Sequence, residues 1–109
     1  MVRPHQKLDA WQEGIRLVTM TYLVTQSFPK EELYGLTAQM RRAAVSIPSN
    51  LAEGAARSSK KELAQFINIS RGSLSELETD HRLGVGLSFA RARDICSFGA
   101  RRKASLRVL

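Results

Sequence analysis

The side chains that most often carry acid–base or metal chemistry are few in this sequence and poorly spaced for it. His5 and His81 are the only histidines, and neither has carboxylates at ligand spacing. Cys96 is the only cysteine, so neither a disulfide nor a cysteine metal cluster can form within one chain. The sequence therefore predicts no metal site and no cofactor.

Candidate nucleophiles and acid–base pairs are equally weak. Glu76 and Glu78 are two residues apart and cannot face each other on a helix. Gly84 and Gly86 alone do not make a phosphate-binding loop, and they fit the end of a helix better. Three serines have no paired general base and fit helix contacts instead: Ser46, Ser49 and Ser70. We therefore expect no catalytic residues, no small-molecule substrate and no enzyme activity.

Basic residues form two clusters that favour binding to a polyanion. The net charge is +7, of which residues 1–80 contribute +1 and residues 81–109 contribute +6. The candidate phosphate-binding residues are Arg57, Lys60, Lys61, Arg91, Arg93, Arg101, Arg102 and Lys103. Such residues attract the RNA or DNA backbone without reading bases, and salt weakens the attraction. The alternative is an ordinary solvated surface. Most aromatic residues fall at buried positions of the expected helices, so base stacking is not predicted.

Apolar spacing predicts the helices that must position these clusters. The first is expected over residues 8–26 and the second over residues 30–55. Ser59 and Glu62 form a capping box for the third helix, and a weak fourth helix is expected within residues 88–109. The apolar stripe of the first helix is Leu8, Trp11, Ile15, Val18, Tyr22 and Thr25. The low aromatic content suits helix-on-helix packing, so the fold class is an all-α, up-down four-helix bundle.

The second helix contains a proline within an uninterrupted apolar stripe. Pro48 removes a backbone hydrogen bond to the carbonyl of Ala44, which predicts a kink at residues 44–48. Asn50 could donate to that free carbonyl instead. The stripe is Leu33, Leu36, Met40, Ala44, Ile47 and Leu51.

The other polar and small residues of this helix suggest packing on a second side. Arg41 or Arg42 could pair with Glu53 within the bundle. The face opposite the stripe is mostly small, so another helix could approach it closely: it holds Gly35, Ala38, Val45 and Ser49. Gly72 weakens the third helix by up to about 1 kcal/mol relative to alanine, and a close helix contact would explain it.

Three segments resemble a known family: residues 28–36, 39–54 and 71–79. The second contains Arg41-Arg42-Ala43, Ser46-Ile47-Pro48-Ser49-Asn50 and Ala52-Glu53-Gly54. In order and spacing they are similar to small bacterial four-helix-bundle proteins encoded in intervening sequences of large-subunit (23S) rRNA genes. The resemblance covers residues 8–89. Residues 90–109 are a divergent basic segment in which the family's acidic fourth helix is not recognisable.

The resemblance implies a four-helix bundle that commonly assembles as a ring of five subunits and has no known catalytic activity. Related proteins of this fold are accessory factors of diversity-generating retroelements, where a basic pentameric barrel binds nucleic acid and a reverse transcriptase. The matching segments assign a structural role to Arg41, Arg42, Pro48, Asn50, Glu53, Gly54 and Gly72.

Together these features predict one domain over residues 1–109 with a kinked second helix and a weak or divergent fourth. The single cysteine and the absence of a signal peptide or long apolar run predict a cytoplasmic protein without a membrane segment. The leading hypothesis is a non-enzymatic homo-oligomer, expected to be a pentamer, that binds RNA or DNA as an accessory protein. The alternatives are a scaffold that binds only protein, and a degenerate family member without a retained function.

Overall fold

The computed structural model describes His5 and residues 8–109, except for the side chains of Arg93 and Cys96. The described residues form four α-helices and one short 3₁₀ turn. In chain order these elements are α1 (Asp9–Thr25), η2 (Lys30–Glu32), α2 (Leu36–Ala55), α3 (Lys60–Gly86) and α4 (Ala92–Val108). The all-α, four-helix prediction is therefore confirmed.

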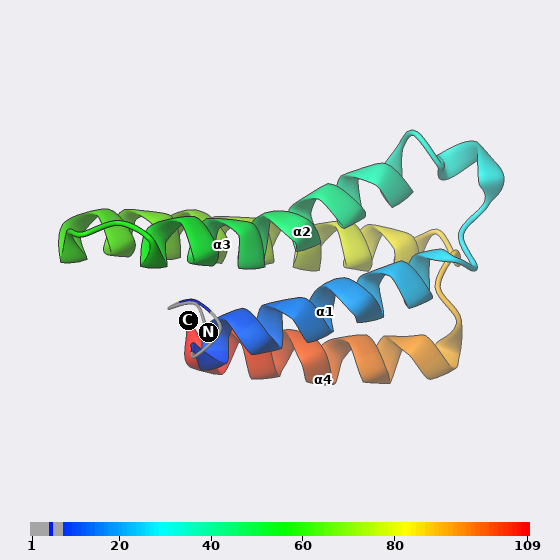
Figure 1. Cartoon of the computed structure of the whole chain (residues 1–109). Coiled ribbons are helices and arrows are strands. Elements are labelled where there is room, and N and C mark those ends of the chain that lie inside the picture. The colour runs from blue at the N-terminus through cyan, green and yellow to red at the C-terminus, as the bar shows by residue number, and fades with distance from the viewer. Residues whose placement is uncertain (1–4, 6–7) are drawn as a thin grey trace.

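The helices alternate in direction and lie in two layers (Figure 1). α2 and α3 run alongside each other in one layer, and α1 and α4 form the other. α1 also packs along α2, whereas α3 and α4 contact each other least of the neighbouring helices. The interface between α3 and α4 is therefore the least extensive of the helix interfaces.

All four helices contribute to one apolar core. Its fully buried members come from every helix: Leu17, Val24, Met40, Ala44, Ile47, Leu77 and Phe98. The predicted stripe of α2 is confirmed from Leu36 to Leu51, while Leu33 lies outside the helix and is 47% exposed. Apolar periodicity thus located the buried face of this helix correctly.

The buried face of α1 differs from the predicted stripe. Ile15 and Tyr22 are exposed, and the buried positions include Gly14, Leu17 and Thr21. Gly14 faces Pro48 of α2, and a Cβ added there would lie at ordinary contact distance, 3.4 Å, from the proline ring. The Thr21 hydroxyl donates to the carbonyl of Leu17 at 2.8 Å, which lets a polar residue be buried. The predicted stripe is therefore only partly correct: Thr25 is buried, and Trp11 and Val18 are half-buried against the core, but the centre of the buried face lies to one side of it.

α2 begins later than predicted and bends as predicted. A 3₁₀ turn occupies residues 30–32, and the Glu32 carboxylate accepts a hydrogen bond from the Leu36 amide at 3.2 Å. This side chain caps the first turn of α2, so the helix starts at Leu36 rather than at Lys30. Figure 1 shows α2 changing direction part-way along its length, and Pro48 lies inside this helix.

Three glycines of α2 and α3 have different roles. A Cβ on Gly54 would lie 2.7 Å from the Cβ of Phe66, so this glycine lets α2 and α3 touch. Gly84 lies within α3 rather than ending it, and the Phe28 ring occupies the space that a side chain there would need. A Cβ added at Gly72 would have no atom of the described residues within 4 Å. The predicted close helix contact at Gly72 is therefore wrong for the single chain.

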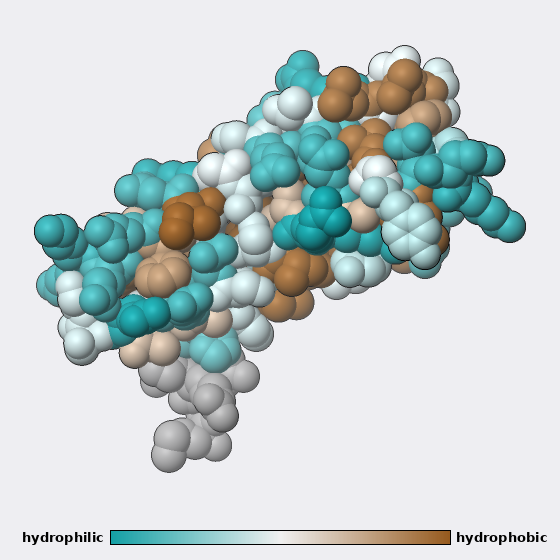
Figure 2. Space-filling view, turned by 90° about the horizontal axis from the view of Figure 1, so that it is seen from above, coloured by the Kyte–Doolittle hydropathy of each residue, from teal (hydrophilic) through white to brown (hydrophobic). Residues whose placement is uncertain are grey.

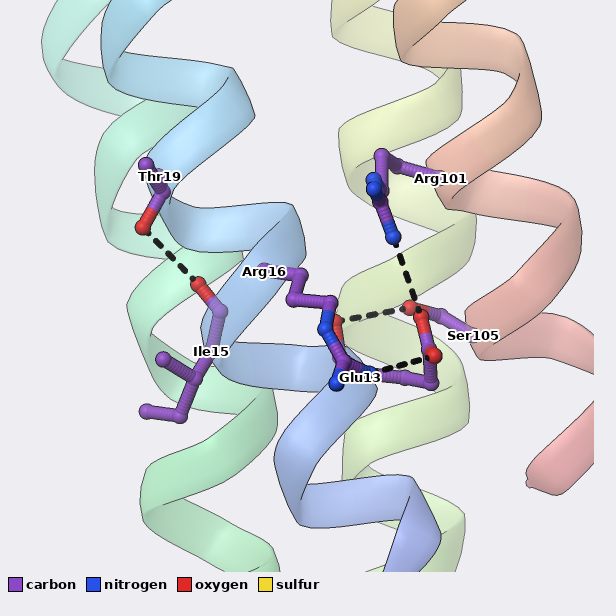
Figure 3. Close-up of polar contacts among 6 residues, drawn as sticks. All are labelled: Glu13, Ile15, Arg16, Thr19, Arg101 and Ser105. Atoms are coloured by element: carbon purple, nitrogen blue, oxygen red, sulfur yellow. Dashed lines mark hydrogen bonds and ion pairs between the residues drawn. The ribbon is translucent and has the colours of Figure 1, made fainter.

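α4 is a regular helix of 17 residues rather than the weak one expected. Phe98 is fully buried and stacks on His81 of α3, with ring centroids 3.9 Å apart. On the other side, the Ser105 hydroxyl donates to the carbonyl of Glu13 on α1 at 3.4 Å (Figure 3). Through these contacts α4 packs against both α3 and α1.

Candidate nucleic-acid interface

The first predicted basic cluster lies at the α2–α3 turn, at one end of the bundle (Figure 1). Arg57 is partly engaged there: its Nη2 lies 2.9 Å from Glu53 Oε1, and its guanidinium lies 5.4 Å from the centre of the Phe66 ring. Lys60 and Lys61 are exposed and form no ion pair with any residue that the structure describes. The two lysines are therefore the free charges of this cluster.

The second predicted cluster does not form one surface with the first. Arg91 is the N-cap of α4, at the opposite end of the bundle (Figure 1). Arg101 lies 3.9 Å from Glu13, and Arg102 lies 3.4 Å from Glu78. Lys103 is exposed, and the side chain of Arg93 lies outside the described residues. Within one chain, the predicted phosphate-binding residues are thus divided among three places.

The polar residues of the α2 segment make different contacts from those expected. Glu53 pairs with Arg57, four residues later, rather than with Arg41 or Arg42. Asn50 Nδ2 donates to the carbonyl of Ser46 at 2.7 Å, not to the carbonyl of Ala44. Both contacts join residues four positions apart, which lie on the same face of a helix.

Arg41 and Arg42 instead border a groove at the α1–α2 seam, which sequence reasoning did not identify. The Arg41 guanidinium lies 4.5 Å from the centre of the Tyr22 ring, and its Nε donates to Thr25 Oγ1 at 3.0 Å. Tyr22 is 42% exposed, and Arg42 is also exposed. Because α1 is rotated from its predicted orientation, Tyr22 lies at the surface beside Arg41 rather than in the core.

Two adjacent ionisable residues of α3, Asp80 and His81, are buried. The sequence did not predict the burial of this pair. Burial raises the pKa of Asp80, with the Glu76 carboxylate adding to the effect. Its Oδ1 accepts a long 3.5 Å hydrogen bond from Gln39, and Oδ2 has no partner among the described residues. Burial lowers the pKa of His81, and the positive charges of Arg102 and Arg82 lower it further.

These shifts predict opposite effects of pH on stability. The depressed pKa of His81 means that, below about pH 6.5, the unfolded chain binds a proton that the folded chain does not. The stability that the neutral His81 side chain contributes is therefore lost as the pH falls. The raised pKa of Asp80 has the opposite sign: its contribution is present below about pH 3.8 and is lost as the pH rises through the folded-state pKa.

An Asp80→Asn variant isolates the histidine. We expect its free energy of unfolding, measured in urea, to decrease between about pH 7 and pH 5.5. Adding His81→Gln should remove most of that decrease. We also expect Asp80→Asn to be more stable than the native chain at pH 7, by on the order of 1 kcal/mol, because it removes a buried carboxylate whose Oδ2 has no partner among the described residues. A flat pH profile in the single variant would contradict the assignment of a neutral His81.

The described residues show neither a metal cluster nor a membrane-spanning helix. No three His, Cys, Asp or Glu side chains among them come together as metal ligands. None of the described helices combines the length and hydrophobicity needed to cross a bilayer.

The fold and the composition place the chain among small four-helix bundles with an excess of positive charge. Residues 6–104 match the model of the 23S rRNA-intervening sequence protein family, so the chain belongs to this family. The match continues beyond residue 89 and includes most of α4. No curated protein matches the chain.

Proposed function

We propose that this protein is a non-enzymatic, homo-oligomeric helical bundle that binds RNA or DNA through phosphate contacts in the cytoplasm. It acts as an accessory to another protein, such as a reverse transcriptase. The observation that carries the proposal is the pair of exposed lysines, Lys60 and Lys61, which have no carboxylate partner among the described residues at the end of the bundle. Free cations on a chain of net charge +7 favour a polyanionic partner.

Exposed apolar residues support self-association. α1 exposes Ile15 and Leu23, and α3 exposes Ile69 and Leu83. Figure 2 shows hydrophobic groups interrupting the hydrophilic surface on the face that it displays. Two different apolar surfaces on one chain suit a head-to-tail contact between copies, and such contacts form rings when they close. The five-subunit ring implied by the family resemblance is one such assembly.

The salt dependence of RNA binding tests this proposal. In the Lys60→Gln/Lys61→Gln variant, we expect the slope of log Kobs against log salt concentration to decrease by about 2, since each lysine neutralises one phosphate. Light scattering should show an unchanged molar mass. Fluorescence anisotropy of a labelled RNA of about 20 nucleotides would give the slope.

A matched control removes the same amount of charge elsewhere. The Arg16→Gln/Arg82→Gln variant loses two exposed arginines that already lie beside Glu13 and Glu78. We expect it to keep the native slope. An equal decrease in both variants would indicate a general effect of net charge, and no RNA binding by the native protein at low salt would refute the proposed function.

A further inference from the structure

A groove at the α1–α2 seam combines positive charge with an exposed aromatic ring. Its volume is about 500 Å³, and its lining is Tyr22, Arg41, Arg42, Val45 and Ser46. A neighbouring depression of about 350 Å³ shares Arg41 and is also lined by Lys30. No carboxylate lines either depression among the described residues. This surface is therefore complementary to an anion.

The charges of this groove differ from those of the α3–α4 groove. In the α3–α4 groove, Glu78 lies 3.4 Å from Arg102 and 3.5 Å from Arg82, so one carboxylate offsets the arginines. In the α1–α2 groove, the Arg41 guanidinium is positioned by its Nε contact to Thr25, and its two Nη groups make no hydrogen bond to a described residue. A fixed guanidinium with free donors can bind a phosphate at a low entropic cost.

Tyr22 adds a contact that a simple anion would not use. The ring is 42% exposed, and Val45 beside it is 40% exposed. The Arg41 guanidinium lies over the Tyr22 ring, 4.5 Å from its centre, and so packs on one face of it. A partly exposed aromatic ring next to phosphate-binding arginines is the arrangement that binds unpaired bases by stacking. Duplex nucleic acid has no free base face to offer.

We propose that this groove binds single-stranded nucleic acid, with Arg41 and Arg42 contacting a phosphate and Tyr22 stacking on the adjacent unpaired base. This inference rests on the proposed function and names the site and the strand state. It places recognition along the side of the bundle, separate from the lysines at the α2–α3 turn.

The test compares single-stranded and duplex oligonucleotides of about 20 residues for native protein, Tyr22→Leu, Tyr22→Phe and Arg42→Gln. We expect Tyr22→Leu to weaken single-strand binding by about five- to tenfold while leaving duplex binding unchanged. Tyr22→Phe should retain native affinity, because it keeps the ring. Arg42→Gln should decrease the salt slope by about 1. Light scattering and thermal unfolding should show that each variant keeps its mass and fold.

Several outcomes would overturn the inference. If both Tyr22→Leu and Arg42→Gln bind like the native protein while Lys60→Gln/Lys61→Gln does not, the protein binds nucleic acid at the turn and not in this groove. If Tyr22→Leu changes the molar mass, the groove is a contact between copies. If the native protein binds neither oligonucleotide, the proposed function itself fails.

Discussion

Replacing Phe98 with alanine is expected to destabilise the fold by about 3–5 kcal/mol, the range for a large aromatic residue removed from a core. Phe98 is fully buried, and its ring stacks on His81 of α3. Phe98 belongs to the single apolar core that all four helices share, so its removal would leave a cavity at the centre of the bundle. Because small domains have only about 5–15 kcal/mol of stability, this loss should be plain in urea unfolding.

Leu106→Ala is the matched control for this experiment. Leu106 lies on the same helix and is 55% exposed, so its removal should change stability by no more than about 0.5 kcal/mol. A Phe98→Ala variant as stable as the control would show that α4 does not pack on the bundle in solution. That result would mean that α4 is the weak helix expected from the sequence.

Gly54→Ala is expected to destabilise the protein by about 1–2 kcal/mol, even though alanine favours a helix more than glycine does. The new Cβ would lie 2.7 Å from the Cβ of Phe66, which cannot move without shifting α3. Overpacking of this kind costs about 1–3 kcal/mol, against a gain in helix propensity of up to about 1 kcal/mol. Thermal unfolding of the purified variant measures the difference.

Gly72→Ala makes the same substitution where the single chain leaves open space. We expect it to stabilise α3 by up to about 1 kcal/mol, because none of the described residues lies within 4 Å of the added Cβ. Opposite signs for the two variants would support the packing at Gly54. A loss of stability in Gly72→Ala, together with a smaller molar mass, would instead place Gly72 in a contact between copies.

Much of the fold could be predicted because strong local patterns agreed with the tertiary contacts. The stripe from Leu36 to Leu51 is buried as predicted, and the Ser59 hydroxyl caps α3 by accepting a hydrogen bond from the Glu62 amide at 3.3 Å. The first helix could not be oriented in this way. Its core face holds Gly14 and Thr21, whereas apolar Ile15 and Tyr22 are exposed.

The candidate site was predictable only in part. The sequence identified Lys60 and Lys61 as a basic cluster, and the structure leaves them exposed. It also grouped Arg101 and Arg102 among the phosphate-binding residues, but carboxylates of α1 and α3 lie beside these arginines. Such pairings depend on which helices become neighbours, and no spacing within α4 encodes that.

The sequence by itself determined the helical class, the family and the surplus of positive charge, because these follow from local periodicity, motif spacing and composition. The tertiary structure alone decided where that charge is free and where it is offset by carboxylates. It also decided that Tyr22 of α1 lies beside Arg41 of α2 on the surface. The physical reason is that both outcomes depend on which helices become neighbours in the folded bundle, and spacing within one helix does not encode that.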